Sequence, residues 1–202
     1  MTPGLWVKIC GLRTESAIVA AVAAGAQAVG FVFCDASPRN VTIHEAQALR
    51  DAVPAGVERV AVFLHPAQAL VDAVIAVLRP DWVQLDAADL ANLQLPARQR
   101  ILPVLRCGAK LSPLPSRLLF ESAHSGSGEK ADWATASKLA TEAEVVLAGG
   151  LDAGNVSDAI AQVRPFGVDV SSGVESSRGV KDSTRIREFV AAARAAHARL
   201  AG

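Results

Sequence analysis

The feature that most constrains the fold is a regular alternation of short apolar segments with helical stretches. Eight segments have the length and composition of buried β-strands: 6–10, 28–33, 59–64, 81–85, 101–105, 117–121, 144–148 and 167–171. Strand–helix alternation favours parallel pairing with right-handed crossovers. An open doubly wound sheet usually has about six strands. Eight units within 202 residues therefore predict an α/β fold, a single small (β/α)₈ TIM barrel.

Signals for helix ends agree with this alternation. Thr42 and Glu45 form a capping-box pattern at the start of one helix. Prolines predict that the fourth and fifth helices are short or irregular, because proline disrupts a helix interior: these are Pro96, Pro113 and Pro115. The helices expected with regular boundaries cover residues 15–24, 42–52, 67–78, 132–143 and about 182 onward.

Composition excludes several classes of protein. Hydrophobic residues make up 51% and charged residues 20%, which argues against disorder. Twenty basic and twenty acidic residues give a net charge of zero, so no global field favours nucleic acid or an anionic membrane. Residues 17–34 are nearly uncharged, but glycines interrupt them, so a helix, a turn and a buried strand are expected rather than a membrane span. One domain over 1–202 is expected, without a linker.

The cysteines suggest a reducing compartment. Cys10, Cys34 and Cys107 have neither disulfide-framework nor zinc-site spacing. The first residues lack the pattern of a signal peptide. A cytoplasmic protein without a metal is therefore expected.

In a barrel of this kind, chemistry belongs at the C-terminal ends of the strands. Two glycine-containing turns, Gly149-Gly150 and Ser172-Gly173, follow the last two predicted strands. Such barrels commonly hold phosphate with backbone N–H groups of the loops after strands seven and eight, where glycine permits close approach. The joint placement of these turns predicts a phosphate site.

Lys8 and Cys10 stand at the end of the first predicted strand. They are two residues apart, so both side chains point to the same side of the strand. A nearby ammonium would favour the thiolate of Cys10. Asp169 alternates with Ser171 on the last strand and is expected to face the same interior, whereas Cys34 and Cys107 are assigned to packing.

Glu121 ends the sixth predicted strand. The loop after it contains His124 and glycines and is interpreted as a lid over the site. Arg39 follows Pro38 in the loop after the second strand, a position that by itself is more typical of a solvated arginine than of a binding residue.

Several segments together resemble the phosphoribosylanthranilate isomerase family of tryptophan biosynthesis. The resemblance covers nearly the whole chain, and its first and last segments are the most specific. The segments are Val7-Lys-Ile-Cys-Gly-Leu12, Gly30-Phe-Val-Phe with Ser37-Pro-Arg39, Val83-Gln-Leu85, Leu147-Ala-Gly-Gly-Leu151 with Asn155-Val156, and Gly167-Val-Asp-Val-Ser-Ser-Gly-Val-Glu175 with Gly179 and Lys181-Asp182. The family is a (β/α)₈ barrel that needs no cofactor or metal.

The resemblance implies an Amadori rearrangement of N-(5-phosphoribosyl)anthranilate to 1-(2-carboxyphenylamino)-1-deoxyribulose 5-phosphate. It makes Cys10 the general base and the strand-six carboxyl, here Glu121, the general acid. Arg39 would hold the anthranilate carboxylate. Lys8 and Asp169 are expected at the substrate, and the two glycine-containing turns at its phosphate.

Two positions depart from the family pattern. Glu121 stands where the family usually has aspartate, one methylene shorter. Asp86 stands where the family usually has histidine after Val-Gln-Leu. The loop after Glu121 still resembles the family's glycine-rich turn, which supports the alignment.

Two alternatives stay open at this point. A related sugar-phosphate isomerase, such as the barrel enzyme of histidine biosynthesis, uses aspartate at the end of strand one, so Cys10 argues against it. A barrel that binds phosphoribosyl ligands without catalysis is the second, and the retention of Lys8, Cys10, Arg39 and both glycine-containing turns argues against it. The expected partner is a small phosphoribosyl substrate, with no nucleic acid and no membrane, and the chain is expected to be a monomer or a homodimer.

Overall fold

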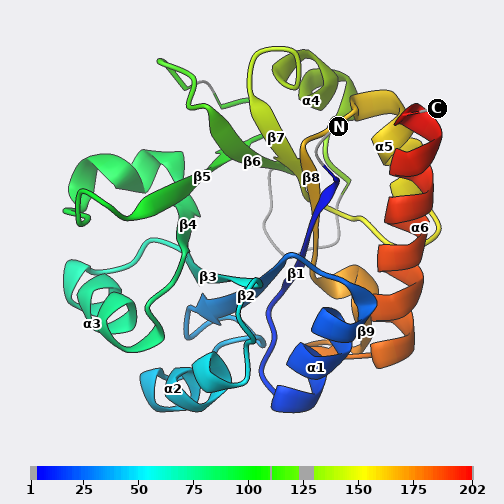
Figure 1. Cartoon of the computed structure of the whole chain (residues 1–202). Helices are drawn as coiled ribbons and strands as arrows, with labels where there is room; N and C mark the ends of the chain where they lie inside the picture. The colour runs from blue at the N-terminus through cyan, green and yellow to red at the C-terminus, as the bar shows by residue number, and fades with distance from the viewer. Residues whose placement is uncertain (1–3, 110, 123–129, 202) are drawn as a thin grey trace.

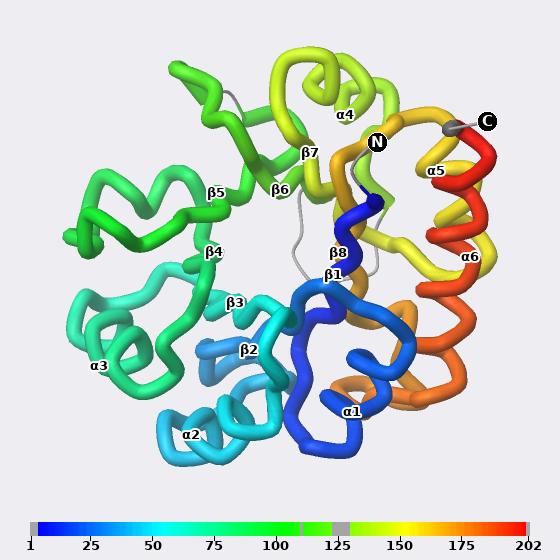
Figure 2. The backbone as a smooth tube through the Cα atoms, in the orientation of Figure 1, coloured from blue at the N-terminus to red at the C-terminus, as the bar shows by residue number. Residues whose placement is uncertain are grey.

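The computed structural model describes residues 4–109, 111–122 and 130–201, in which eight parallel strands close into a barrel with helices around it (Figure 1). The strands follow one another around the barrel in sequence order, so β8 closes it against β1 (Figure 2). They are β1 Trp6–Cys10, β2 Ala28–Phe33, β3 Glu58–Phe63, β4 Trp82–Asp86, β5 Arg100–Arg106, β6 Arg117–Glu121, β7 Glu144–Leu147 and β8 Gly167–Val170. The predicted (β/α)₈ fold is confirmed.

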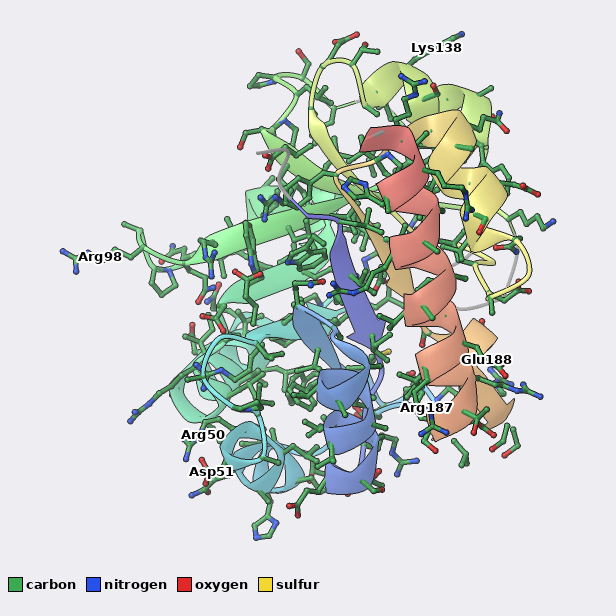
Figure 3. All side chains as sticks on the ribbon, turned by 45° about the vertical axis from the view of Figure 1, so that its right-hand side comes forward. Arg50, Asp51, Arg98, Lys138, Arg187 and Glu188 are labelled. Carbon is green, nitrogen blue, oxygen red and sulfur yellow. The ribbon has the colours of Figure 1, made fainter. Side chains whose placement is uncertain are left out.

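Helices cover the outside of the barrel, and charged side chains such as Arg187 and Glu188 project outward from them (Figure 3). The α-helices are α1 Glu15–Ala24, α2 Ile43–Asp51, α3 Gln68–Leu78, α4 Trp133–Leu139, α5 Val156–Val163 and α6 Ser183–Ala201. Two short 3₁₀ helices, η1 Ala87–Asn92 and η2 Ser172–Val174, and a hairpin of β9 Glu175–Ser177 and β10 Val180–Lys181 complete the fold.

Local sequence signals fix most helix ends. Thr14 caps α1 by accepting from the Ala17 amide, and Gly25 ends it in the left-handed conformation. The irregularity expected after β4 and β5 is confirmed: η1 follows β4, and the described residues between β5 and β6 form no helix. The prediction that the helix after Asp132 reaches residue 143 is wrong, since α4 ends at Leu139.

The strands alternate between two cores, as the pleat requires. Outward-facing residues such as Val7 and Ile9 pack against the helices. Inward-facing residues at the lower end of the barrel are apolar, and include Trp6 and Trp82. Above them the interior becomes polar, beginning with Lys8. The upper layer is therefore where the fold holds its buried charge.

Among the described residues, no helix is both long and apolar enough to cross a membrane. The nearly uncharged stretch 17–34 divides into α1, a turn at Gly25 and the buried strand β2. The apolar character of β2 comes from its position in the sheet, where both of its faces are covered.

The capping box of α2 gives a direct test of local stability. The Thr42 hydroxyl accepts from the Glu45 amide, and the Glu45 carboxylate accepts from the Thr42 amide at 2.7 Å. We expect Thr42→Ala to lower the free energy of unfolding by about 1 kcal/mol in urea titrations. Gln47→Ala, an exposed change in the same helix, is the control and should stay within about 0.5 kcal/mol. Equal effects of the two changes would contradict the role of the cap.

Candidate active site

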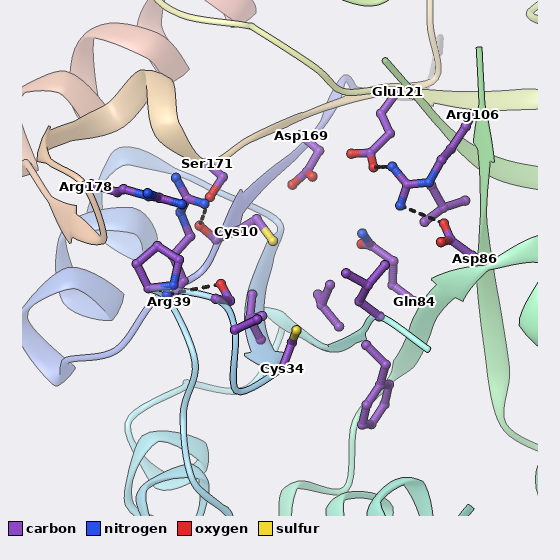
Figure 4. A pocket seen from close by; sticks show the side chains of 18 residues that line it. Cys10, Cys34, Arg39, Gln84, Asp86, Arg106, Glu121, Asp169, Ser171 and Arg178 are labelled. Atoms are coloured by element: carbon purple, nitrogen blue, oxygen red, sulfur yellow. Dashed lines mark hydrogen bonds and ion pairs between the residues drawn. The ribbon is translucent and has the colours of Figure 1, made fainter. Parts of the chain in front are cut away.

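A cavity of about 230 Å³ opens at the C-terminal end of the barrel (Figure 4). Residues from nearly every part of the barrel line it, in agreement with the location of chemistry in this fold. Its polar and reactive lining residues are Cys10, Cys34, Ser37, Arg39, Gln84, Asp86, Arg106, Glu121, Asp169, Ser171 and Arg178.

Lys8 is the deepest charged group of the site, with 0% of its surface exposed. The register of β1 against β8 places it beside Asp169. Its ammonium donates to Asp169 Oδ1 and to Gln84 Oε1, each at 2.9 Å. Burial alone would lower the pKa of Lys8, but the charges of Asp169 and Cys10 raise it, so the lysine stays charged. Lys8 and Asp169, each expected to face the interior of the barrel, are paired there.

Cys10 is buried at the end of β1, above Lys8. Gly30 on β2 makes room for both, because a Cβ there would lie 3.0 Å from Cys10 Sγ and 3.0 Å from Lys8 Cε. Burial raises the pKa of the Cys10 thiol, and the Lys8 charge only partly opposes this. The expected thiolate-favouring ammonium is therefore present, but it does not overcome burial.

Arg39 lies 7% exposed in the cavity wall and is held by a carboxylate. Its Nε and Nη2 donate to the two oxygens of Glu175, at 2.7 and 3.0 Å. Lys181 Nζ donates to the same carboxylate at 2.7 Å. Burial opposes ionisation of Glu175, but these hydrogen bonds lower its pKa to about 2. The two cations and one anion leave this cluster with a net positive charge.

Ser171 connects this cluster to the end of β1. Its hydroxyl donates to the backbone carbonyl of Cys10 at 3.2 Å, and its own carbonyl accepts from Lys181 Nζ at 2.9 Å. The end of β1 is thereby tied to the segment that follows β8. Ser171 and Lys181 thereby link the backbone at Cys10 to the cluster that holds Arg39.

Glu121 enters the cavity from the wall formed by β6, across the site from Cys10 (Figure 4). Arg106 on β5 lies between it and Asp86 on β4. The guanidinium is 2.5 Å from Glu121 Oε1 and 2.8 Å from Asp86 Oδ1. Asp86, which has no evident function in the sequence, therefore belongs to the same charged group as Glu121.

The two turns predicted to hold phosphate lie against each other. Gly149 and Gly150 follow β7 with φ of 89° and 61°, which is the left-handed region that favours glycine. A Cβ on Gly173 would lie 2.0 Å from the carbonyl oxygen of Leu151, so only glycine fits there. Ser172 and Gly173 form the start of η2. The fold thus brings the two turns together, and Ser172 and Gly173 lie in a short 3₁₀ helix.

Sequence reasoning missed four polar residues of the cavity region or gave them no role. Gln84 and Arg106 follow the inward-facing alternation of their strands, so a barrel register could have found them. Lys181 and Arg178 lie on the hairpin after β8, whose approach to the cavity no local pattern predicts. Arg178 is exposed and still lines the cavity.

Two predictions about cysteines need correction, and one histidine cannot be placed. Cys34 lies half-buried in the cavity wall, and Cys107 is exposed, so the assignment of both to packing is wrong. Each follows the end of a strand, where the barrel opens and side chains leave the core. His124 lies outside the described residues.

One group of described side chains has metal-ligand types at close range. His65, Asp86 and Asp89 each place one ligand atom within 4.8 Å of the others. These atoms already have partners, since His65 Nδ1 pairs with Asp89 at 2.9 Å and Arg106 lies against Asp86. The guanidinium also opposes a second cation at Asp86. The contacts therefore account for this cluster as ion pairs.

Comparisons with known proteins agree with this geometry. A sequence model of the family described as N-(5'-phosphoribosyl)anthranilate (PRA) isomerase matches residues 7–192. N-(5'-phosphoribosyl)anthranilate isomerase of Pelobacter propionicus is 37% identical over 194 residues, which cover 91% of this chain and 93% of the relative.

Solved structures are similar over the same extent. A phosphoribosyl anthranilate isomerase in complex with reduced 1-(o-carboxyphenylamino)-1-deoxyribulose 5-phosphate has a TM-score of 0.77 at 27% identity, covering 95% of this chain and 99% of that one. A structure of monomers generated from the dimeric Thermotoga maritima enzyme has a TM-score of 0.79 at 29% identity, with 95% and 99% covered. The chain belongs to the phosphoribosylanthranilate isomerase family.

Proposed function

We propose that this chain catalyses the Amadori rearrangement of N-(5-phosphoribosyl)anthranilate, the isomerase step of tryptophan biosynthesis. Family membership supports this activity, and so does the product analogue bound by a solved relative. The single observation that carries the proposal is the placement of Cys10, Glu121 and Arg39 around one cavity (Figure 4). A thiol, a carboxyl and a guanidinium are the groups that a base, an acid and a carboxylate clamp require.

The reaction needs an acid and a base on two sides of one sugar. Glu121 gives a proton to the ring oxygen as its bond to carbon one breaks, and the nitrogen lone pair forms a Schiff base. Cys10 then removes the proton from carbon two, and the electron pair moves to give an enolamine. Tautomerisation of the enolamine yields the aminoketose, so no atom is gained or lost overall.

The raised pKa of Cys10 has a consequence for this scheme. The resting thiol is protonated, so the base must form as the substrate enters. Lys8 is the adjacent charge that favours the thiolate, while Asp169 opposes it. Lys8 and Asp169 therefore act on the substrate mainly through Cys10 and the shape of the cavity floor.

Substrate anions are bound at two ends. Arg39 uses two of its five N–H donors to bind Glu175, so three N–H donors remain for the anthranilate carboxylate. Gly149, Gly150, Ser172 and Gly173 provide backbone N–H groups for the phosphate. The net positive charge of the Arg39–Glu175–Lys181 cluster supports carboxylate binding.

The alternative activities are less well supported. A barrel of the histidine-biosynthesis type would have aspartate at the end of β1, where Cys10 stands. A phosphoribosyl-binding barrel without catalysis would have no need for an acid opposite a buried thiol. We also propose a cytoplasmic enzyme, as a monomer or homodimer, that uses no metal or cofactor. The three free cysteines are consistent with a reducing compartment.

The first test is the activity itself with Cys10→Ala. Purified protein given fresh phosphoribosylanthranilate should consume it, which is followed by loss of anthranilate-type fluorescence. Cys10→Ala should lower kcat by about two to four orders of magnitude, because general-base removal has that cost. Cys34→Ala, in the wall of the same cavity, is the matched control and should stay active. Near-normal kcat in a folded Cys10→Ala protein would reassign the cysteine to packing.

The second test concerns Arg39. Arg39→Lys keeps the charge but loses the parallel pair of donors, so KM should rise about 10- to 100-fold. Arg187→Lys, on the outside of α6, should leave KM unchanged. Steady-state kinetics decide the matter, and an unchanged KM in Arg39→Lys would show that the carboxylate is held elsewhere.

The third test concerns the phosphate turns. Gly150→Ala adds a Cβ where backbone N–H groups are expected to approach the anion, so KM should rise at least tenfold. Gly56→Ala is the control, because Gly56 also has positive φ (91°) but nothing within 4 Å of an added Cβ. It tests the cost of an alanine at positive φ without the anion site. A similar KM in the two variants would remove Gly150 from phosphate binding.

A further inference from the structure

The two departures from the family pattern, Asp86 and Glu121, meet at one guanidinium. We propose that Arg106 is a positioning residue that holds Glu121 in the cavity, and that Asp86 offsets the charge of Arg106 so that Glu121 can carry a proton. The inference rests on the proposed role of Glu121 as general acid. It gives Asp86 a function and explains why the two departures occur together.

Strand register builds this group. β5 pairs with β6 so that Arg106 lies beside Glu121. β4 pairs with β5 so that Asp86 lies beside Val104, two residues before Arg106 and on the same face. The guanidinium therefore reaches both carboxylates from the strand between them. Nη1 lies 2.5 Å from Glu121 Oε1, and Nη2 lies 2.8 Å from Asp86 Oδ1 (Figure 4).

All three side chains are largely shielded from water. The exposed fractions are 11% for the side chain of Asp86, 22% for that of Arg106 and 12% for that of Glu121. Burial alone would lower the pKa of Arg106, but the charges of Glu121 and Asp86 raise it. Arg106 therefore keeps its charge, and its interactions act through less screening than on a surface.

Charge counting shows what Asp86 contributes. A guanidinium beside one carboxyl lowers the pKa of that carboxyl and holds it ionised, which disfavours an acid catalyst. With two ionised carboxylates, the group has a net charge of −1, and one added proton makes it neutral. Asp86 therefore restores the proton affinity that Arg106 alone would remove from Glu121.

Among the described residues, His65 beside Asp86 and Lys8 across the cavity are already paired with acids. His65 lies 3.9 Å from Asp86 Oδ2 and is bound more closely by Asp89, at 2.9 Å. Across the cavity, Lys8 is neutralised by Asp169. These pairs add little net charge at Glu121 compared with the guanidinium in contact with it.

The contact between Arg106 and Glu121 also explains how glutamate can stand where the family usually has the shorter aspartate. Glutamate has one more rotatable bond than aspartate, so an unrestrained carboxyl would sample more positions. The contact with Arg106 fixes one carboxyl oxygen. A misplacement of about 1 Å can cost about a hundredfold in rate, so this restraint matters for proton transfer.

The experiment measures the protonation of Glu121 directly, without substrate. The protein is labelled with ¹³C at glutamate carboxyls, and the Glu121 signal is assigned by its loss in Glu121→Gln. Asp86→Asn should lower the pKa of Glu121 by about one unit, because the guanidinium is no longer offset. Arg106→Met should raise it, because two carboxylates then face each other. Asp89→Asn is the control next to Asp86 and should change it little.

Kinetics separate position from charge. Arg106→Lys keeps a cation but cannot bridge both carboxylates, so kcat should fall at least tenfold with KM unchanged. Asp86→Asn should lower kcat at neutral pH about tenfold, and the loss should shrink as the pH falls and Glu121 regains its proton. If Asp86 had only a structural role, Asp86→Asn would leave the pH dependence of kcat unchanged.

The outcomes are distinct. If Asp86→Asn leaves the pKa of Glu121 unchanged or raises it, the offset by Asp86 is wrong, even where Arg106→Met fails to fold. If the pKa values move as expected but Glu121→Gln retains full kcat, the charged group exists and the assignment of Glu121 as general acid fails instead. Unchanged kcat in Arg106→Lys would remove the positioning role.

Discussion

The structure depends on a lysine ammonium buried at the centre of the barrel. Lys8 has no exposed surface and is held by Asp169 and Gln84. An unpaired ammonium at this position would lower the free energy of unfolding by several kcal/mol, so the folded barrel needs both partners. Because they come from β4 and β8, this interaction joins three strands across the interior. It also divides the barrel: the interior is apolar below Lys8, and its buried charges lie above.

Three charged groups surround the cavity, and each has a separate task in the proposed chemistry. Lys8 with Asp169 supports the base Cys10 from below. The Arg39 cluster keeps a net positive charge for a carboxylate. The Arg106 group has a net charge of −1 when both its carboxylates are ionised, and can therefore take a proton. In the proposed chemistry, the substrate carboxylate meets the Arg39 cluster, with acid and base on opposite walls of the cavity.

Much of the fold and part of the site could be predicted from the sequence. The other contacts of the site depend on packing between segments that are distant in the chain. Apolar strands and capping residues gave the barrel, with Thr42 and Gly25 marking helix ends as observed. Strand alternation predicted that Lys8 and Asp169 face the interior, and the register of β1 against β8 then places them side by side. The capture of Arg39 by Glu175 did not, because 136 residues separate them and a loop meets a hairpin. Arg106 was missed because its meaning depends on the register of three strands.

The central claim is that the buried Lys8 charge lowers the pKa of Cys10 and so partly offsets the effect of burial. The most direct measurement is the pH titration of the Cys10 thiolate absorbance in a Cys34→Ala, Cys107→Ala protein, with and without Lys8→Met. The account predicts that loss of the ammonium raises the pKa of Cys10 further, because the charge of Lys8 lowers it and that of Asp169 raises it. An unchanged or lower pKa of Cys10 in the folded Lys8→Met protein would contradict it.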